Sequence, residues 1–166
     1  MTDATATGAV LTPETEEKKI TDAKSTVERY CFVCTGNTCR SPMAAAAANA
    51  LLGGRGVFAF SAGLFVPFPS PISRNALLAL ERRGIQPVPG NDYRLHMSRQ
   101  LDAELLESAD RVYGMTDEHV LRIMMAFPEH AGKIASLGVS VPDPYGGDLD
   151  EYEKTLDIII EAVRKL

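Results

Sequence analysis

The stretch RYCFVCTGNTCRSPMAAAAANALL at residues 29–52 decides how this chain folds. Tyr30 to Val33 is apolar and predicts a buried strand, whereas Met43 to Leu52 is rich in alanine and predicts a helix. Between them lies the short polar segment 34–40, which we call the phosphate loop. A strand, a tight loop and a helix N-terminus together form a geometry that binds phosphate, because the loop amides and the helix dipole both point at the anion.

The phosphate loop also carries the groups of a nucleophilic reaction. It begins with the thiol of Cys34 and ends with the guanidinium of Arg40. A helix N-terminus beside a cation favours the thiolate, which is the nucleophilic form of cysteine. Arg40 is planar and permanently charged, so it can bind two phosphate oxygens at once and stabilise the transition state. The spacing therefore predicts that Cys34 attacks phosphorus and forms a cysteinyl-phosphate.

The loop resembles the signature Cys-x-Gly-Asn-x-Cys-Arg-Ser-Pro of the low-molecular-weight protein (tyrosine) phosphatases. Within that family the chain is most similar to the bacterial protein arginine phosphatases, because Thr38 stands where the tyrosine-specific relatives carry a larger aliphatic residue. The resemblance runs from about Tyr30 to the C-terminus. Further family-like segments are Ser61-Ala62-Gly63, 96–100, 107–110 and 143–147.

The resemblance implies a role for each residue of the site. Cys34 is the nucleophile, Arg40 holds the phosphate, and Asp143 is the general acid that protonates the leaving group and later the base that activates water. Ser61 and His96, with Asn37, hydrogen-bond the loop into its shape. The family's reaction uses no cofactor, takes a phosphorylated protein as its substrate and releases inorganic phosphate. The residues that would bind phosphate are Thr35, Gly36, Asn37, Thr38, Cys39, Arg40 and Ser41, whose hydroxyl also donates to the Cys34 sulfur.

Thr38 bears on the choice of substrate. A polar, β-branched residue at the pocket edge tolerates the planar, hydrogen-bonding guanidinium of phosphoarginine and grips the ring of phosphotyrosine less well. Phe65, Phe68 and Tyr145 could instead sandwich an aromatic substrate. We therefore expect phosphoarginine as the favoured substrate, with phosphotyrosine as the alternative.

The remaining cysteines and histidines receive smaller roles. Cys31 should be an inert core thiol, since buried cysteines usually only pack. Cys39 either forms a disulfide with Cys34 under oxidation, which protects the nucleophile, or fills the loop interior as a small residue. His119 and His130 are predicted at surface positions of helices, without a role. The histidines and cysteines show no metal-binding spacing, so we expect no metal site.

Strands alternate with helices along the rest of the chain, which predicts right-handed crossovers and a parallel sheet. We expect an α/β three-layer sandwich, with a four-stranded parallel sheet flanked by helices and the phosphate loop after the first strand. Ser41 would cap the helix that follows the loop. The later strands are predicted at 57–61, 111–115 and 134–137, and the later helices at 71–83, 102–107, 117–127 and 149–165.

Length and charge limit the classes of function. The 166 residues suit one domain at 27–166, behind an N-terminal extension at 1–26 that is poor in large apolar residues and predicted to be flexible. A net charge of −5 argues against nucleic acid as a partner. No apolar run approaches the roughly 20 residues that a bilayer span needs, so no membrane association is expected. Three clustered cysteines form no disulfide framework, so we expect a cytoplasmic protein, monomeric or weakly dimeric.

Three other functions share parts of this pattern. An arsenate reductase of the same fold needs a cysteine downstream of Cys39, and the sequence has none. A phosphate-binding module without activity has no use for both Cys34 and Asp143. A phosphotransfer subunit that keeps phosphate on cysteine has no use for a residue that activates water. All three fit the residues less well than a phosphatase does.

Overall fold

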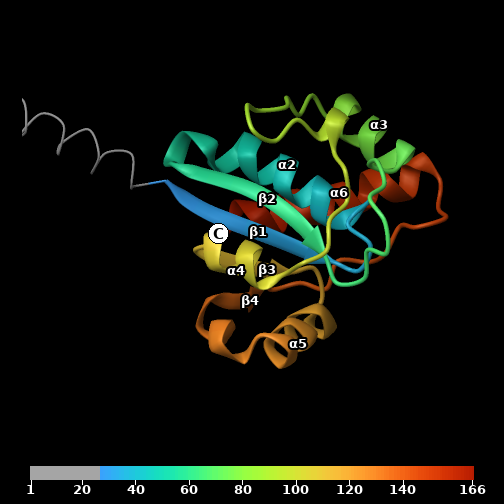
Figure 1. The fold of residues 1–166 in the computed structure, drawn as a ribbon. Helices are drawn as coiled ribbons and strands as arrows, with labels where there is room; N and C mark the ends of the chain where they lie inside the picture. Colours follow the sequence, from blue (N-terminus) through green and yellow to red (C-terminus); the bar gives the residue numbers. More distant parts are fainter. Residues whose placement is uncertain (1–26) are drawn as a thin grey trace, which may run out of the picture.

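The fold is built on a parallel sheet of four strands in the order β2-β1-β3-β4 (Figure 1). The computed structural model describes residues 27–166, and the predicted N-terminal extension lies outside them. The strands are β1 (Glu28–Cys34), β2 (Val57–Gly63), β3 (Arg111–Gly114) and β4 (Ile134–Ser136). Each pair of neighbouring strands is parallel, which confirms the predicted sheet.

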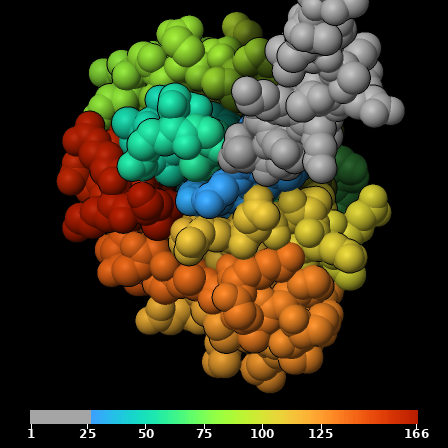
Figure 2. Space-filling model, turned by 90° about the vertical axis from the view of Figure 1, so that its left-hand side faces the viewer, coloured from blue at the N-terminus to red at the C-terminus, as the bar shows by residue number. Residues whose placement is uncertain are grey.

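Helices cover both faces of this sheet. The helices are α2 (Arg40–Leu52), α3 (Arg74–Arg82), α4 (Ala103–Ser108), α5 (Asp117–Ala126) and α6 (Leu149–Arg164). Helices α2, α3 and α6 share one cluster of buried residues, and α4 and α5 contribute to a second cluster on the opposite face. Figure 2 shows these layers from the side, with blue β1 between the green-to-cyan and the yellow-to-orange segments. The predicted three-layer sandwich is therefore confirmed.

Most helix and strand boundaries lie within a few residues of the predicted ones. The largest shifts are three residues: α2 begins at Arg40 instead of Met43, and α3 begins at Arg74 instead of Pro71, because Pro71 pairs with Met97 in an isolated bridge. Short 3-10 helices at Tyr93–Leu95 and Pro128–Lys133 lie where the sequence predicted no regular structure. No helix between residues 27 and 166 has the length and apolar character needed to cross a membrane.

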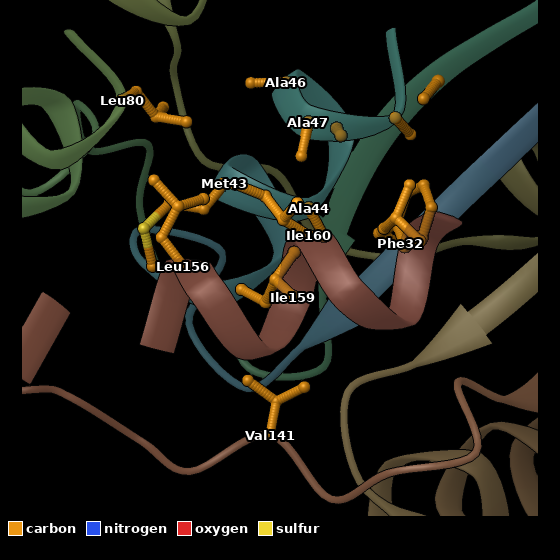
Figure 3. Packing of buried hydrophobic residues seen from close by; sticks show 14 of the residues in the cluster. Phe32, Met43, Ala44, Ala46, Ala47, Leu80, Val141, Leu156, Ile159 and Ile160 are labelled. Carbon is orange, nitrogen blue, oxygen red and sulfur yellow. The ribbon is translucent and has the colours of Figure 1, made fainter. Parts of the chain in front are cut away.

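Helix α2 is the centre of the larger core. Its alanines from Ala44 to Ala48 are all buried, which lets α6 and the sheet approach its backbone closely. Figure 3 shows Met43 of α2 beside Leu156 of α6, with Phe32 of β1 on the sheet side. Each of these large side chains stabilises the fold by about 1.5–3 kcal/mol through its burial. The core therefore fixes the position of α2, and with it the end of the phosphate loop.

The prediction that Ser41 caps α2 is wrong. The cap position lies two residues earlier, at Cys39, so the helix begins at Arg40; within residues 27–166 no side chain caps it. The hydroxyl of Ser41 instead lies inside the loop, 3.0 Å from the sulfur of Cys34. In the first turn of α2, the N–H groups of Arg40 and Ser41 are consequently left for an anion in the loop, because Pro42 has no N–H and Met43 donates to the Cys39 carbonyl.

The sheet order places the phosphate loop at a switch point. Strand β1 lies between β2 on one side and β3 on the other, so the chain leaves β1 in one direction and later returns to its other side. In open parallel sheets the crevice at such a point, beyond the carboxyl ends of the strands, is where ligands bind. The loop follows the carboxyl end of β1 and occupies this crevice.

Gly63, at the end of β2, supports the loop from below. A Cβ atom at this position would lie 2.7 Å from the carbonyl oxygen of Thr35 and 3.0 Å from the Cβ of Asn37. Since a backbone oxygen cannot rotate away, any side chain here must displace the loop or the strand. The close approach of loop and sheet therefore requires glycine.

We predict that Gly63→Ala lowers the free energy of unfolding by about 1–3 kcal/mol, because the added methyl group overpacks a rigid contact. The measurement is urea unfolding followed by circular dichroism. Gly53→Ala is the matched control: Gly53 has φ −57° and ψ −39°, and a Cβ there meets nothing within 4 Å. If both variants unfold at the wild-type midpoint, the close contact at Gly63 does not exist.

Candidate active site

The phosphate loop encloses a bowl of about 210 Å³ at the carboxyl end of β1. Six consecutive loop residues after Cys34 curve around it, and two residues of the loop between β4 and α6 complete its wall. The sequence-predicted site thus comes together from segments about 100 residues apart. The lining residues are Cys34, Thr35, Gly36, Asn37, Thr38, Cys39, Arg40, Asp143 and Tyr145.

The sulfur of Cys34 lies in this bowl and receives hydrogen bonds from its surroundings. The backbone N–H of Asn37 donates to Sγ at 3.3 Å, and the hydroxyl of Ser41 lies 3.0 Å from it. Hydrogen bonds of this kind stabilise a thiolate over a thiol. The residue as a whole is only 3% exposed, so reagents reach the sulfur through the bowl.

Asn37 is the residue that holds the loop in shape. Its φ of 57° lies in the left-handed region, which asparagine tolerates better than most side chains. Its Nδ2 donates to the hydroxyls of Ser41 at 2.8 Å and Ser61 at 2.9 Å. Its Oδ1 accepts the backbone N–H of Arg99 at 3.0 Å, which fixes the orientation of the amide.

This orientation also fixes the direction of the Ser41 hydroxyl. Because Ser41 Oγ accepts from Asn37, its own hydrogen is free to donate, and the Cys34 sulfur at 3.0 Å is closer than the Ala62 carbonyl at 3.4 Å. The predicted donation from Ser41 to Cys34 is consistent with these distances. Ser41 lies behind the sulfur and does not line the bowl.

His96 supports the same loop from another segment. Its Nε2 lies 2.7 Å from the backbone carbonyl oxygen of Asn37. A carbonyl oxygen only accepts, so Nε2 carries the hydrogen and donates it. Burial lowers the pKa of His96, with the bond to Asn37 acting in the opposite direction. We therefore expect a neutral His96 that holds the carbonyl of Asn37 turned away from the bowl.

Arg40 and Asp143 face each other across the bowl. The Arg40 side chain is 8% exposed, donates from Nη1 to the Val141 carbonyl oxygen at 3.2 Å, and places Nη2 3.6 Å from Asp143 Oδ2. Asp143 is 56% exposed, and its Oδ1 accepts the backbone N–H of Tyr145 at 3.1 Å. The cation is thus held inside the bowl and the carboxyl group at its rim.

The four residues predicted to set specificity do not all line the bowl. Thr38 and Tyr145 do, and Tyr145 is 80% exposed at the mouth. Phe65 lines a neighbouring cavity of about 300 Å³ that shares Thr35 with the bowl. Phe68 is exposed on the surface. Thr38 and Tyr145 therefore line the bowl in which the substrate phosphate would bind, whereas the two phenylalanines lie outside it.

The three cysteines have different surroundings, and all are free thiols. Burial raises the pKa of Cys31 to about 12, as expected of a core thiol. The sulfur of Cys39 lies 3.3 Å from the Tyr152 hydroxyl and 3.4 Å from the Ser73 hydroxyl. The Cys39 side chain therefore contacts α6 and the start of α3, and the residue also lines the bowl.

The prediction for His119 is wrong. Instead of a surface position it occupies the first turn of α5, is 5% exposed, and places Nε2 2.9 Å from the hydroxyl of Thr35. His130 is likewise not on an α-helix but in the 3-10 helix after α5, with a side chain that is 18% exposed. Arg99 was also missed, because it acts on Asn37 through its backbone, which no side-chain pattern reveals.

Comparison with known proteins places this site in a family. Residues 29–166 match the family described as low molecular weight phosphotyrosine protein phosphatase. The chain is 37% identical over 144 residues to a protein-arginine-phosphatase of Bacillus subtilis, covering 81% of this chain and 91% of the relative. It is 30% identical to the low molecular weight protein-tyrosine-phosphatase PtpB of Staphylococcus haemolyticus, covering 83% and 96% of the two chains.

A solved structure of the YwlE arginine phosphatase, a mutant with a phosphorylated active-site serine, superimposes with a TM-score of 0.74 at 35% identity. The match covers 82% of this chain and 91% of that one. The structural match and the family match agree over most of the described domain. The chain therefore belongs to the low-molecular-weight protein phosphatase family, and it is a hydrolase acting on phosphorylated protein side chains.

Proposed function

We propose that this phosphatase works through a cysteinyl-phosphate intermediate on Cys34 and favours phosphoarginine as its substrate. The observation that carries the proposal is the arrangement of three groups around one bowl. A hydrogen-bonded sulfur lies in it, a buried guanidinium lies on its wall, and the exposed Asp143 carboxyl stands at its rim. This is the set of groups that a two-step phosphoryl transfer needs.

In the first step the Cys34 thiolate attacks phosphorus, a sulfur–phosphorus bond forms, and the bond between phosphorus and the substrate side chain breaks. The phosphoryl oxygens bind the Arg40 guanidinium in place of Asp143, whose Oδ2 lies 3.6 Å from Arg40 Nη2 before substrate binds. Asp143 is then free to donate its proton to the leaving nitrogen or oxygen. The N–H groups of the phosphate loop stabilise the charge on the three transferring oxygens.

In the second step water attacks the cysteinyl-phosphate. Asp143, now a carboxylate, takes a proton from this water, and inorganic phosphate leaves as the sulfur–phosphorus bond breaks. The Ser41 hydroxyl, 3.0 Å from the sulfur, stabilises the departing thiolate. The YwlE mutant structure with a phosphorylated active-site serine supports a covalent phospho-enzyme, since that phosphate sits on an active-site side chain.

Thr38 supports phosphoarginine over phosphotyrosine, because it lines the bowl, where its hydroxyl can bond a guanidinium that a bulky aliphatic residue would exclude. The relatives include an arginine phosphatase at 37% identity and tyrosine phosphatases at similar identity. Phosphotyrosine is the second candidate, because the exposed ring of Tyr145 at the mouth offers a stacking surface to an aromatic substrate.

We further propose that Cys34 and Cys39 form a disulfide under oxidation and that the protein works in the cytoplasm. Both sulfurs are free, and Cys39 lies at the turn that leads into α2. A disulfide would protect the nucleophile from irreversible oxidation. The reducing cytoplasm would keep such a thiol active.

We predict that Cys34→Ser abolishes turnover of p-nitrophenyl phosphate, since a serine hydroxyl is not ionised at neutral pH. Arg40→Lys keeps the charge but loses the planar fork, and kcat should fall by about 10²-fold. Both variants should retain the wild-type unfolding midpoint within a few degrees. Wild-type turnover by Cys34→Ser would exclude a cysteinyl-phosphate route.

Asp143→Asn should lower kcat by about 10²- to 10³-fold, with the larger loss on substrates that have a poor leaving group. The measurement compares phenyl phosphate with p-nitrophenyl phosphate below pH 7, because a good leaving group needs less protonation. Asp150→Asn, at an exposed position in the first turn of α6, is the matched control. Equal losses on both substrates would argue against Asp143 as the acid.

Thr38→Ile should shift the ratio of kcat/KM for phosphoarginine over phosphotyrosine by about tenfold toward phosphotyrosine, the size expected of one pocket contact. Thr38→Val keeps the shape of threonine without its hydroxyl and separates polarity from bulk. If the valine variant behaves like isoleucine, the hydroxyl sets the preference. An unchanged ratio in both variants would remove Thr38 from the specificity argument.

A further inference from the structure

We infer that His119 is a positioning residue of the active site, which holds the first turn of the phosphate loop through its hydrogen bond to Thr35. His119 belongs to α5, on the opposite face of the sheet from α2, and does not itself line the bowl; it acts on the bowl only through Thr35. The inference rests on the phosphatase activity of the family and not on the choice between phosphoarginine and phosphotyrosine.

Both ring nitrogens of His119 are engaged. Nε2 lies 2.9 Å from Thr35 Oγ1, and Nδ1 lies 2.9 Å from Thr116 Oγ1. Thr116 is the N-cap of α5, and its Oγ1 also accepts the backbone N–H of His119 at 3.2 Å. The imidazole thus connects the cap of one helix to the loop that precedes another.

The surroundings of the two threonines favour one tautomer. Thr116 Oγ1 already accepts a backbone N–H, so its own hydrogen is available for Nδ1. A neutral imidazole then carries its hydrogen on Nε2 and donates it to Thr35 Oγ1. Each tautomer leaves one threonine hydroxyl hydrogen without a partner among the described residues: that of Thr35 in this tautomer and that of Thr116 in the other. Thr35 is exposed and Thr116 is partly buried, so solvent satisfies the Thr35 hydroxyl more readily, which favours donation from Nε2 to Thr35.

Thr35 is held on two sides by this arrangement. Its carbonyl oxygen accepts the backbone N–H of Phe65 at 2.9 Å, and its side chain is held by His119. A trans peptide places C=O and the following N–H on opposite sides, so the contact with Phe65 turns the Gly36 N–H away from Phe65. Gly36 lines the bowl, and its N–H is one of the donors that must be in place before phosphate arrives. His119 completes the fixation of this peptide unit.

The sheet is shaped to let α5 reach the loop. A Cβ at Gly114, the last residue of β3, would lie 2.8 Å from the backbone nitrogen of Val120 and 3.1 Å from the Cβ of His119. Only glycine allows the first turn of α5 to lie this close to the strand. The approach brings His119 within reach of Thr35, which follows the neighbouring strand β1.

The surroundings keep His119 uncharged. Burial lowers the pKa of His119 to about 4, and the positive charge of Arg40 acts in the same direction. Arg122 adds to this effect, whereas Glu118 and Asp143 oppose it. At neutral pH the imidazole therefore supports the loop without placing a second cation beside Arg40.

The test compares two substitutions that each keep half of the contact. His119→Gln places an amide near the position of Nε2 and can still bond Thr35, whereas His119→Asn places it near Nδ1 and keeps only the bond to Thr116. With p-nitrophenyl phosphate, we expect kcat to fall about tenfold in the asparagine variant, as for one lost hydrogen bond, and to stay within about threefold of wild type in the glutamine variant. His130→Asn, in the 3-10 helix after α5, is the matched histidine control and should keep the wild-type kcat.

A second arm separates positioning from general destabilisation. Thr35→Val should lower kcat as much as His119→Asn does, and the double variant should lose no more than either single one, because both remove the same bond. Competitive inhibition by inorganic phosphate should weaken in parallel with kcat. Additive losses, a wild-type kcat in His119→Asn, or equal losses in the glutamine and asparagine variants would each overturn the inference. A wild type without turnover would instead contradict the proposed function.

The buried imidazole also predicts a change of stability with pH. The unfolded chain binds a proton on His119 near the ordinary pKa of 6.5, whereas the folded protein resists protonation until about pH 4. This residue therefore lowers the stability of the wild type as pH falls from 6.5 to 4, and has no further effect below. In urea unfolding, the free energy of unfolding of His119→Gln relative to that of the wild type should rise as the pH falls from 6.5 to 4. A constant difference would show that the imidazole is not held neutral.

Discussion

The side chain of Asn37 is the interaction on which the phosphate loop depends. It is fully buried. Its amide nitrogen donates to the hydroxyls of Ser41 and Ser61, and its amide oxygen accepts the backbone N–H of Arg99. The left-handed backbone at this position costs about 1–2 kcal/mol for an ordinary residue, and these bonds offset it. Aspartate has the same shape but no donor, so both serine hydroxyls would have to donate to it, and the Ser41 hydrogen would no longer be free for the Cys34 sulfur. Asparagine is therefore required by the direction of three hydrogen bonds, and not by size alone.

The same network explains why two cysteines three residues apart differ so much. Cys31 is enclosed by apolar side chains, and burial raises its pKa to about 12. Cys34 receives the N–H of Asn37 and lies against the hydroxyl of Ser41, and it faces the first turn of α2. Burial without donors makes a thiol inert, whereas the donors around Cys34 can hydrogen-bond its sulfur when it acts as a nucleophile. The protein is acidic as a whole, so this effect is local.

Local patterns in the sequence were sufficient to predict β1, the loop, α2 and α6, because each depends on residues near in the chain. Asp143 and Tyr145 were placed at the loop by resemblance, and they do line the bowl. The position of His119 could not be predicted this way. It follows two exposed acidic residues in a helix, and its burial depends on how closely α5 approaches Gly114 and Thr35. Such contacts are set by packing between distant segments, which no window of sequence contains.

The loop is consequently held from three directions by segments that do not touch phosphate. The strand β2 supports it at Gly63, the segment around His96 and Arg99 holds Asn37, and α5 holds Thr35 through His119. Backbone N–H groups that converge on one point repel each other when no anion is bound there. A loop without support would therefore open. Rigid support from both faces of the sheet keeps the donors in position before the substrate binds, and this lowers the reorganisation that the reaction requires. The activity of the nine residues that line the bowl therefore depends on the packing of the whole domain.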